Sequence, residues 1–144
     1  MIKDILAFVF FGLFSLAAHA GPAEDARAHF EAIAAGQLDA LMAQYAPEAT
    51  FQWVGGPLDG AYSGVERIRE VWSKFVKNGP YSVSVAKLEE SANDKGATVT
   101  ANVQFSGKTA VKVRYVLVFR GGKVVNAVWQ VDPRLSFDSG YKPY

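Results

Sequence analysis

Residues 29–60, HFEAIAAGQLDALMAQYAPEATFQWVGGPLDG, decide the fold of this chain. The stretch predicts the end of one helix, a stop at Gly36, a second short helix, a break at Pro47 and then an aromatic strand. This order is typical of a bent sheet wrapped around helices, an architecture that usually encloses a pocket. The pattern indicates a fold and a pocket, and it does not identify a ligand.

Three helices are predicted before residue 80. Pro22 at the first turn and Gly36 as the left-handed cap place the first helix at about residues 22–35. The second helix presents one apolar face, made of Leu38, Leu41, Met42 and Tyr45, and stops before Pro47. Ser63 and Glu66 predict a capping box that starts the third helix, whose buried side carries Ile68, Val71, Trp72 and Phe75.

The strands follow a period of two. A first strand is predicted at residues 50–54, a loop at 55–60, and four further strands near 81–90, 97–106, 110–120 and 123–132. Tight loops between the last four indicate an antiparallel meander. The fold class is therefore α+β: a cone-shaped, strongly bent antiparallel sheet wrapped around about three N-terminal helices. The outward side of strand 110–120 is partly apolar, which predicts a homodimer interface.

The N-terminus predicts export. Residues 5–18, ILAFVFFGLFSLAA, form an apolar run after Lys3, and Ala18-His19-Ala20 fits a signal peptidase site. The run is shorter than the roughly 20 residues of a membrane span, so no stable span is expected after cleavage. We expect a signal peptide at 1–20, a cone domain at 21–132, a C-terminal tail at 133–144, and a periplasmic or secreted protein. An uncleaved membrane anchor is the alternative for the first segment.

Composition excludes several functions. The net charge is +1 without a basic run, so no nucleic-acid partner is expected. The chain has no cysteine, which removes thiol chemistry and disulfides. His29 is the only histidine after residue 20, which argues against a transition-metal site. No cofactor is predicted.

The chain resembles the nuclear transport factor 2-like superfamily, and within it the SnoaL-like and ketosteroid-isomerase-like branches. The residues that carry the resemblance are AGQLDALMAQYAPEATFQW, the glycine-rich loop after it, SGVERIREVW and the closing hairpin FRGGKVVNAVWQVD. The resemblance covers most of residues 21–144. It implies the cystatin-like, SnoaL-like cone fold rather than one reaction, because this fold hosts isomerases, cyclases, hydrolases, dehydratases and non-enzymatic binding modules.

Position by position, the resemblance to ketosteroid isomerases implies two hydrogen-bond donors and a proton-carrying aspartate. The donor on the first helix falls on His29, and the second donor falls on Tyr115. The aspartate falls on Trp53, and indole cannot remove and return a proton. The acid–arginine–acid set of the epoxide-hydrolase branch is also missing, since its acid positions hold residues such as Asn102, Gln104 and Trp129.

Candidate site residues follow from this comparison and from composition. His29 and Tyr115 are candidate catalytic donors, and Asp59 in the loop is a candidate replacement acid. An aromatic lining for a flat apolar ligand is predicted from Trp53, Trp72, Trp129, Phe30 and Tyr45. Three hypotheses stay open: a binding module for a small apolar molecule, an isomerase, cyclase or dehydratase-type enzyme using His29 and Tyr115, and a homodimeric interaction module with a filled interior.

Overall fold

The computed structural model describes residues 21–137. Within this range three helices precede or interrupt the strands: α2 (Pro22–Ala35), α3 (Leu38–Met42) and α4 (Val65–Val76). The strands are β1 (Tyr45–Val54), β2 (Gly60–Ser63), β3 (Ser82–Asn93), β4 (Gly96–Ser106), β5 (Ala110–Arg120) and β6 (Lys123–Val131).

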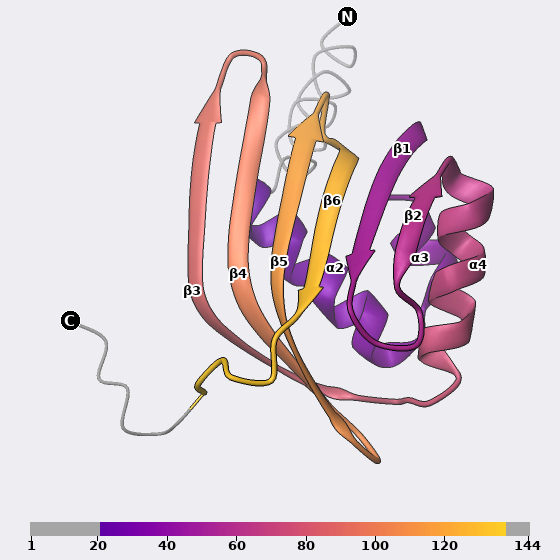
Figure 1. Cartoon of the computed structure of the whole chain (residues 1–144). Coiled ribbons are helices and arrows are strands. Elements are labelled where there is room, and N and C mark those ends of the chain that lie inside the picture. The colour runs from indigo at the N-terminus through magenta and orange to yellow at the C-terminus, as the bar shows by residue number, and fades with distance from the viewer. Residues whose placement is uncertain (1–20, 138–144) are drawn as a thin grey trace, which may run out of the picture.

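The six strands form one curved, open sheet in the order β2-β1-β6-β5-β4-β3. The strands β3 to β6 pair antiparallel with their sequence neighbours, and β1 joins the sheet parallel to β6. Helix α2 crosses behind the sheet, α4 lies beside β2, and no helix covers the face that is turned to the viewer (Figure 1). The predicted α+β class, the meander and the one-sided helices are confirmed.

Helix α2 begins and ends where the sequence predicts. Pro22 occupies its first turn, and Gly36 adopts a left-handed φ of 70° after its last residue. The Gly36 N–H bonds the backbone carbonyl of Ile33, and the Gln37 N–H bonds that of Ala32, which satisfies two carbonyls that the helix end leaves open. The chain can then turn at once into α3.

The region between α3 and α4 differs from the prediction. Helix α3 ends at Met42, and Tyr45 is the first residue of β1, not the last of a helix. Pro47 lies inside β1 at an irregularity in its pairing with β6, because proline cannot donate to a regular ladder. Strand β2 is not among the predicted strands, and only its first residue, Gly60, falls in the predicted loop at 55–60. Its Tyr62 pairs with Phe51 of β1.

The predicted capping box of α4 is wrong. The residue that precedes the helix is Gly64, with a φ of 86°, and no side chain caps the first turn. The Gly64 carbonyl instead accepts the first helical bond from the Ile68 N–H at 3.1 Å, and its own N–H donates to Ala49 in β1. The start of α4 is therefore fixed by the sheet rather than by Ser63 and Glu66.

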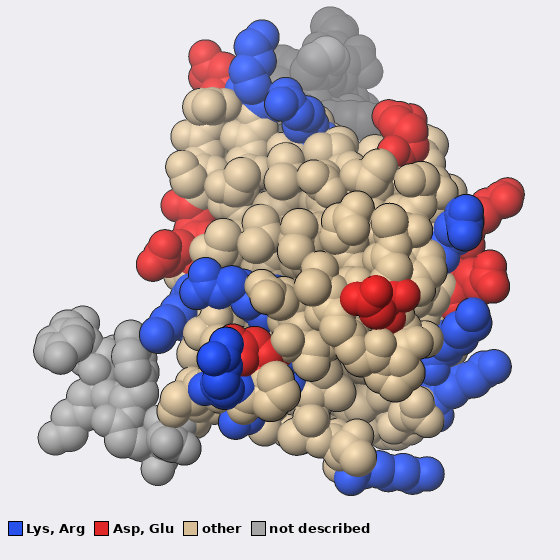
Figure 2. Space-filling model, in the orientation of Figure 1, with Lys and Arg blue, Asp and Glu red and all other residues tan. Residues whose placement is uncertain are grey.

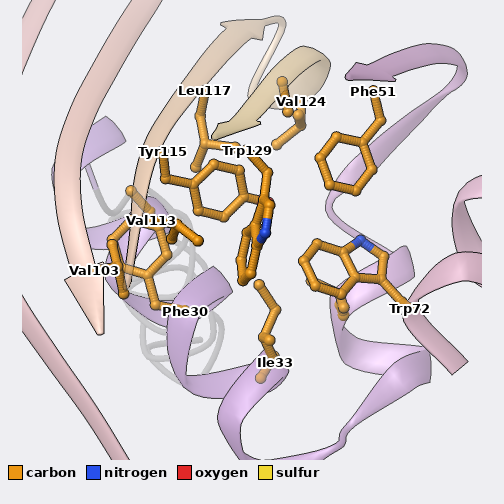
Figure 3. Packing of buried hydrophobic residues seen from close by; sticks show 14 of the residues in the cluster. Phe30, Ile33, Phe51, Trp72, Val103, Val113, Tyr115, Leu117, Val124 and Trp129 are labelled. Atoms are coloured by element: carbon orange, nitrogen blue, oxygen red, sulfur yellow. The ribbon is translucent and has the colours of Figure 1, made fainter. Parts of the chain in front are cut away.

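Side chains alternate along β5 as predicted. Val113, Tyr115, Leu117 and Phe119 are buried against the helices, and the residues between them face outward. The interior is filled by large rings: Trp129 lies in its middle, with Tyr115 and Phe30 on one side and Trp72 and Phe51 on the other (Figure 3).

The chain after β6 stays near the sheet over the part that the structure describes. The Asp132 N–H bonds the Lys112 carbonyl at 2.9 Å, and the Lys112 ammonium lies 6.0 Å from the ring centroid of Phe137. The rest of the predicted tail and the predicted signal peptide at 1–20 lie outside the described residues. No helix within residues 21–137 is both long and apolar enough to cross a membrane.

Candidate functional site

His29 and Tyr115, the two candidate donors, meet inside the protein. His29 lies on α2 and Tyr115 on β5, and the His29 Nε2 atom is 2.7 Å from the Tyr115 hydroxyl oxygen. Both side chains are buried, with exposed fractions of 0% and 1%. The sheet thus brings together two residues that are 86 positions apart in the sequence.

The contact of the second ring nitrogen of His29 determines which atom donates the hydrogen bond between His29 and Tyr115. His29 Nδ1 is 2.9 Å from the Gln44 Oε1 atom, and the Gln44 Nε2 atom donates to the Asp25 backbone carbonyl at 3.3 Å. A carboxamide oxygen only accepts, so Nδ1 carries the proton and donates to it. In a neutral ring Nε2 then has no proton, and it accepts the hydrogen bond from the Tyr115 O–H.

Burial keeps this ring neutral. The pKa of His29 is lowered from 6.5 to about 4, chiefly because burial disfavours the charged imidazolium, while the bond to Gln44 acts in the opposite direction. The pKa of the Tyr115 hydroxyl is raised well above its usual value, first by burial and then by the neighbouring Tyr45. At neutral pH the pair is therefore uncharged.

The polar contacts continue to Trp72. The hydroxyls of Tyr115 and Tyr45 interact, and the Trp72 indole Nε1 donates to the Tyr45 hydroxyl at 3.0 Å. Burial raises the pKa of Tyr45 above its usual value. These groups satisfy one another within an otherwise apolar interior, as buried polar groups must. The Trp129 indole N–H, in contrast, is buried without a partner among residues 21–137.

A cavity of about 550 Å³ opens where β1 and β6 end, beside the end of α4 and the β4–β5 hairpin. We call it the mouth pocket. Most of its wall is apolar or aromatic, and its polar members come from α4, the segment after it and the hairpin. It is lined by Trp53, Gly55, Gly56, Pro57, Leu58, Lys74, Phe75, Asn78, Tyr81, Lys108, Thr109, Val111 and Val131.

Tyr81 forms a fixed part of this wall. Its ring stacks on Phe75 at a centroid distance of 4.8 Å, and its hydroxyl donates to the Phe75 carbonyl at 3.0 Å. A Cβ atom at Gly79 or at Gly107 would come within 3.0 Å of the Tyr81 ring. Only glycine allows both backbone segments to pack so closely against it. The ring is thus held in place before any ligand binds.

Asp59 lies apart from His29 and Tyr115 in the glycine-rich loop. Its side chain is exposed, and its Oδ1 atom accepts a hydrogen bond of 2.7 Å from the Gly55 N–H. The carboxylate closes the loop between β1 and β2. Leu58, its neighbour, lines the mouth pocket, but Asp59 does not.

The five predicted lining residues occupy different depths. Trp53 reaches the wall of the mouth pocket, whereas Trp72, Trp129 and Phe30 are at most 1% exposed in the packed interior. Tyr45 borders a smaller hollow of about 320 Å³ between the start of β1 and α4. The large rings lie in contact, with centroids of Trp53 and Trp129 4.8 Å apart.

Several residues that contact His29 or line the mouth pocket were not predicted from the sequence. Gln44 gives no local sign of its bond to His29, although a histidine on an apolar helix face requires a polar partner. Lys74 lies off the predicted buried side of α4. Lys108 lies in a predicted loop between two strands, and Tyr81 starts the strand predicted near 81–90. No periodicity reveals that these segments converge, because the convergence depends on the bend of the sheet. Among residues 21–137, no three side chains of the types that bind metals gather into a metal site.

A curved, open sheet over three helices, with a closed interior and a pocket at one end, defines a small α+β cone protein. Residues 26–127 match the family model described as the SnoaL-like domain. This match spans most of the chain, and the protein belongs to the SnoaL-like domain family, within the NTF2-like superfamily. A search of curated proteins gave no match.

Solved structures share the fold at low sequence identity. An NTF2-like protein of unknown function from Pseudomonas putida is 16% identical, with a TM-score of 0.65 and coverage of 74% of this chain and 81% of that one. A ketosteroid isomerase-like protein from Erwinia carotovora atroseptica is 15% identical, with a TM-score of 0.61 and coverage of 75% and 91%. A protein of unknown function with a cystatin-like fold from Nostoc punctiforme is 16% identical, with a TM-score of 0.61 and coverage of 78% and 89%. These likenesses concern the fold alone.

Proposed function

We propose that this SnoaL-like domain binds a small, mostly apolar molecule in the mouth pocket and does not transform it. The observation that carries the proposal is the pocket itself: a volume of about 550 Å³ behind a wall that is largely apolar and aromatic. Sites for small ligands typically measure roughly 300–1,000 Å³ and combine an apolar lining with a few polar groups. Trp53 and the fixed ring of Tyr81 supply flat surfaces for such a ligand.

The chemistry of the interior supports binding without turnover. The Tyr115 O–H donates to His29 Nε2, so that the proton needed to polarise a substrate carbonyl is already engaged. Neither side chain lines the mouth pocket. The position of the proton carrier is held by Trp53, and the Asp59 carboxylate is engaged by the Gly55 N–H.

The proposal is tested by titrating the protein with N-phenyl-1-naphthylamine, an uncharged apolar fluorophore whose emission rises in apolar surroundings. We expect saturable binding to one site. Val111→Phe places a larger side chain in the pocket wall and so narrows the pocket. It should weaken binding of the fluorophore about tenfold, the equivalent of ~1.4 kcal/mol. Ala28→Phe, on the exposed side of α2 and outside the pocket lining, is the matched control and should bind as the unchanged protein does. Absence of saturable binding, or equal binding by both variants, would contradict the proposal.

An enzyme using His29 and Tyr115 is the second candidate. It is favoured by one observation, the neutral imidazole bonded to a tyrosine hydroxyl at 2.7 Å in a water-poor interior. Such an enzyme would convert a β,γ-unsaturated ketone to its conjugated isomer by moving one proton from the α to the γ carbon. Formation of the conjugated product would be followed by absorbance, and His29→Ala should abolish it in a protein that stays folded. No product above the uncatalysed rate would exclude this role for that substrate class.

We also propose that the protein is exported and acts in the periplasm or outside the cell as a homodimer. The apolar N-terminal run and the Ala18-His19-Ala20 sequence support cleavage after Ala20. The expected result is an intact mass that corresponds to a chain beginning at Gly21, and retention of Met1 on the exported protein would contradict it.

The uncovered sheet face presents a broad uncharged area, with charged side chains mainly toward its edges (Figure 2), which supports pairing of two copies through this face. If the protein is only a homodimeric interaction module with a filled interior, it should not bind N-phenyl-1-naphthylamine.

A further inference from the structure

The charged residues of the mouth pocket are all of one sign. Lys74 and Lys108 belong to its lining, and no aspartate or glutamate does. Lys74 comes from the last turn of α4, and Lys108 comes from the hairpin between β4 and β5. Basic side chains are seen along the same end of the molecule, at the tip of this hairpin and beside the end of α4 (Figure 2). The pocket therefore has an apolar body and a basic rim.

These two ammonium groups are only weakly engaged by the protein. Lys74 Nζ lies 3.7 Å from the Glu70 Oε1 atom, and both side chains are more than half exposed. Such exposed pairs are worth little and exchange readily with other partners. Lys108 is exposed, and among residues 21–137 it forms no ion pair. Both groups can therefore approach a bound anion.

The other polar groups in and near the mouth pocket are also consistent with an apolar body and a basic rim. The Tyr81 hydroxyl already donates its hydrogen bond to the Phe75 carbonyl, so Tyr81 offers a ligand its ring rather than a hydrogen-bond donor. The amide of Asn78 and the hydroxyl of Thr109 lie on the same basic side, as lining residues next to the end of α4 and to the hairpin. The Asp59 carboxylate, which is the acid of the neighbouring loop, is outside the lining and is bound to the Gly55 N–H.

We propose that the ligand of the mouth pocket is an organic anion: an apolar, preferably aromatic body that carries one carboxylate or sulfonate. Its body packs against Trp53, Tyr81 and Val131, and its anionic group lies at the solvent edge between Lys74 and Lys108. This inference rests on the proposed function, because it names the chemistry of the molecule that the pocket takes. It adds a prediction that the pocket alone does not make, namely a preference for negative charge.

Two fluorophores distinguish the contribution of the anionic group to binding from that of the apolar body. 8-Anilino-1-naphthalenesulfonate and N-phenyl-1-naphthylamine share the same pair of ring systems, and only the first carries a sulfonate. We expect the sulfonate to bind about five- to tenfold more tightly at low salt, since each exposed charge pair contributes modestly. Its affinity should fall as sodium chloride is raised from 20 to 500 mM, because salt screens exposed charges, while that of the uncharged probe should not fall.

The lysine variants test the assignment directly. Lys74→Met/Lys108→Met should remove the preference for the sulfonate and leave the affinity for the uncharged probe unchanged. Lys77→Met/Lys95→Met is the matched control: it removes the same charge from lysines outside the lining and should keep the preference. Equal affinities of the unchanged protein for the two probes, or equal losses in the two double variants, would overturn the anion proposal. Failure of both probes to bind would instead overturn the proposed function.

Discussion

The Tyr115 hydroxyl donates a hydrogen bond of 2.7 Å to the His29 Nε2 atom, and the two side chains are closed off from solvent. The resemblance to ketosteroid isomerases predicts the two hydrogen-bond donors of a site at these two positions. In this protein each satisfies the other, with Gln44 fixing the imidazole from its far side. The same two residues thus serve the packed interior, and the pocket lies elsewhere, at the end of the sheet.

Tyr115→Phe should destabilise the protein without weakening ligand binding. Among residues 21–137 the Tyr115 hydroxyl is the one donor to His29 Nε2, so the substitution leaves a buried acceptor unpaired, which costs about 1–3 kcal/mol of unfolding free energy. Urea unfolding measures the loss. Tyr62→Phe is the control: its hydroxyl donates to the Leu58 carbonyl in a half-buried position, where water can replace it, and the loss should be smaller. A stable Tyr115→Phe protein that no longer binds the uncharged fluorophore would point to a direct role in the site.

Stability should fall as the pH is lowered from about 6.5 to about 4, because His29 must stay neutral to stay buried. Its pKa is about 4 in the folded protein and 6.5 in the unfolded chain. The unfolded state therefore binds more protons between these values, so the stabilisation is complete above pH 6.5 and is lost on acidification. The loss amounts to roughly 3 kcal/mol at 1.36 kcal/mol per unit. Urea midpoints across this range measure it.

His29→Gln isolates this contribution from that of the carboxylates, which also titrate in acid. The variant should be less stable than the unchanged protein at pH 7.5, and the gap between the two should shrink toward pH 4. A gap that does not change with pH would show that His29 does not titrate in this window.

The two central tryptophans should respond differently to the same substitution. Trp72 and Trp129 are both fully buried, but the Trp72 N–H donates to Tyr45, whereas that of Trp129 has no partner among residues 21–137. Trp72→Phe should therefore cost about 1 kcal/mol more than Trp129→Phe, because it breaks a buried hydrogen bond. Thermal or urea unfolding of the two variants compares them. Equal losses, or a larger loss for Trp129→Phe, would mean that ring volume alone sets the cost.

The outer face of the sheet should mediate dimerisation. Val116 and Val128 are paired on β5 and β6 and alternate with the buried residues of both strands, so they point outward. Light scattering at tens of micromolar should give the mass of a dimer for the unchanged protein and that of a monomer for Val116→Lys. Ala35→Lys, on the exposed end of α2, should leave the dimer intact. A monomeric unchanged protein would reject this interface.

The parts of the fold that local sequence determines were predictable. Helix α2 has a proline at its start and a glycine at its end, and both act through their own backbone preferences. The hairpins of β3 to β6 follow from alternation and turn residues. Strand β1 was predicted too short, because Tyr45 falls on the apolar period of the preceding helix and Pro47 normally ends a strand. Pairing with β6 overrides both signals.

The candidate site was predictable only in its parts. His29 and Tyr115 could each be singled out, but their contact depends on how β5 is placed against α2, which no local pattern encodes. The basic rim is harder still, because Lys74 and Lys108 are separated by two strands and converge only through the bend of the sheet. Exposed lysines on a helix and in a turn carry no mark of such a role.

A crystal structure of the protein with N-phenyl-1-naphthylamine would show where the ligand binds. We expect density for the fluorophore at the end of the sheet, against Trp53 and Tyr81, with the bond between His29 and Tyr115 unchanged. Density for the fluorophore in contact with His29, with Tyr115 turned toward it, would show instead that the interior pair forms the binding site.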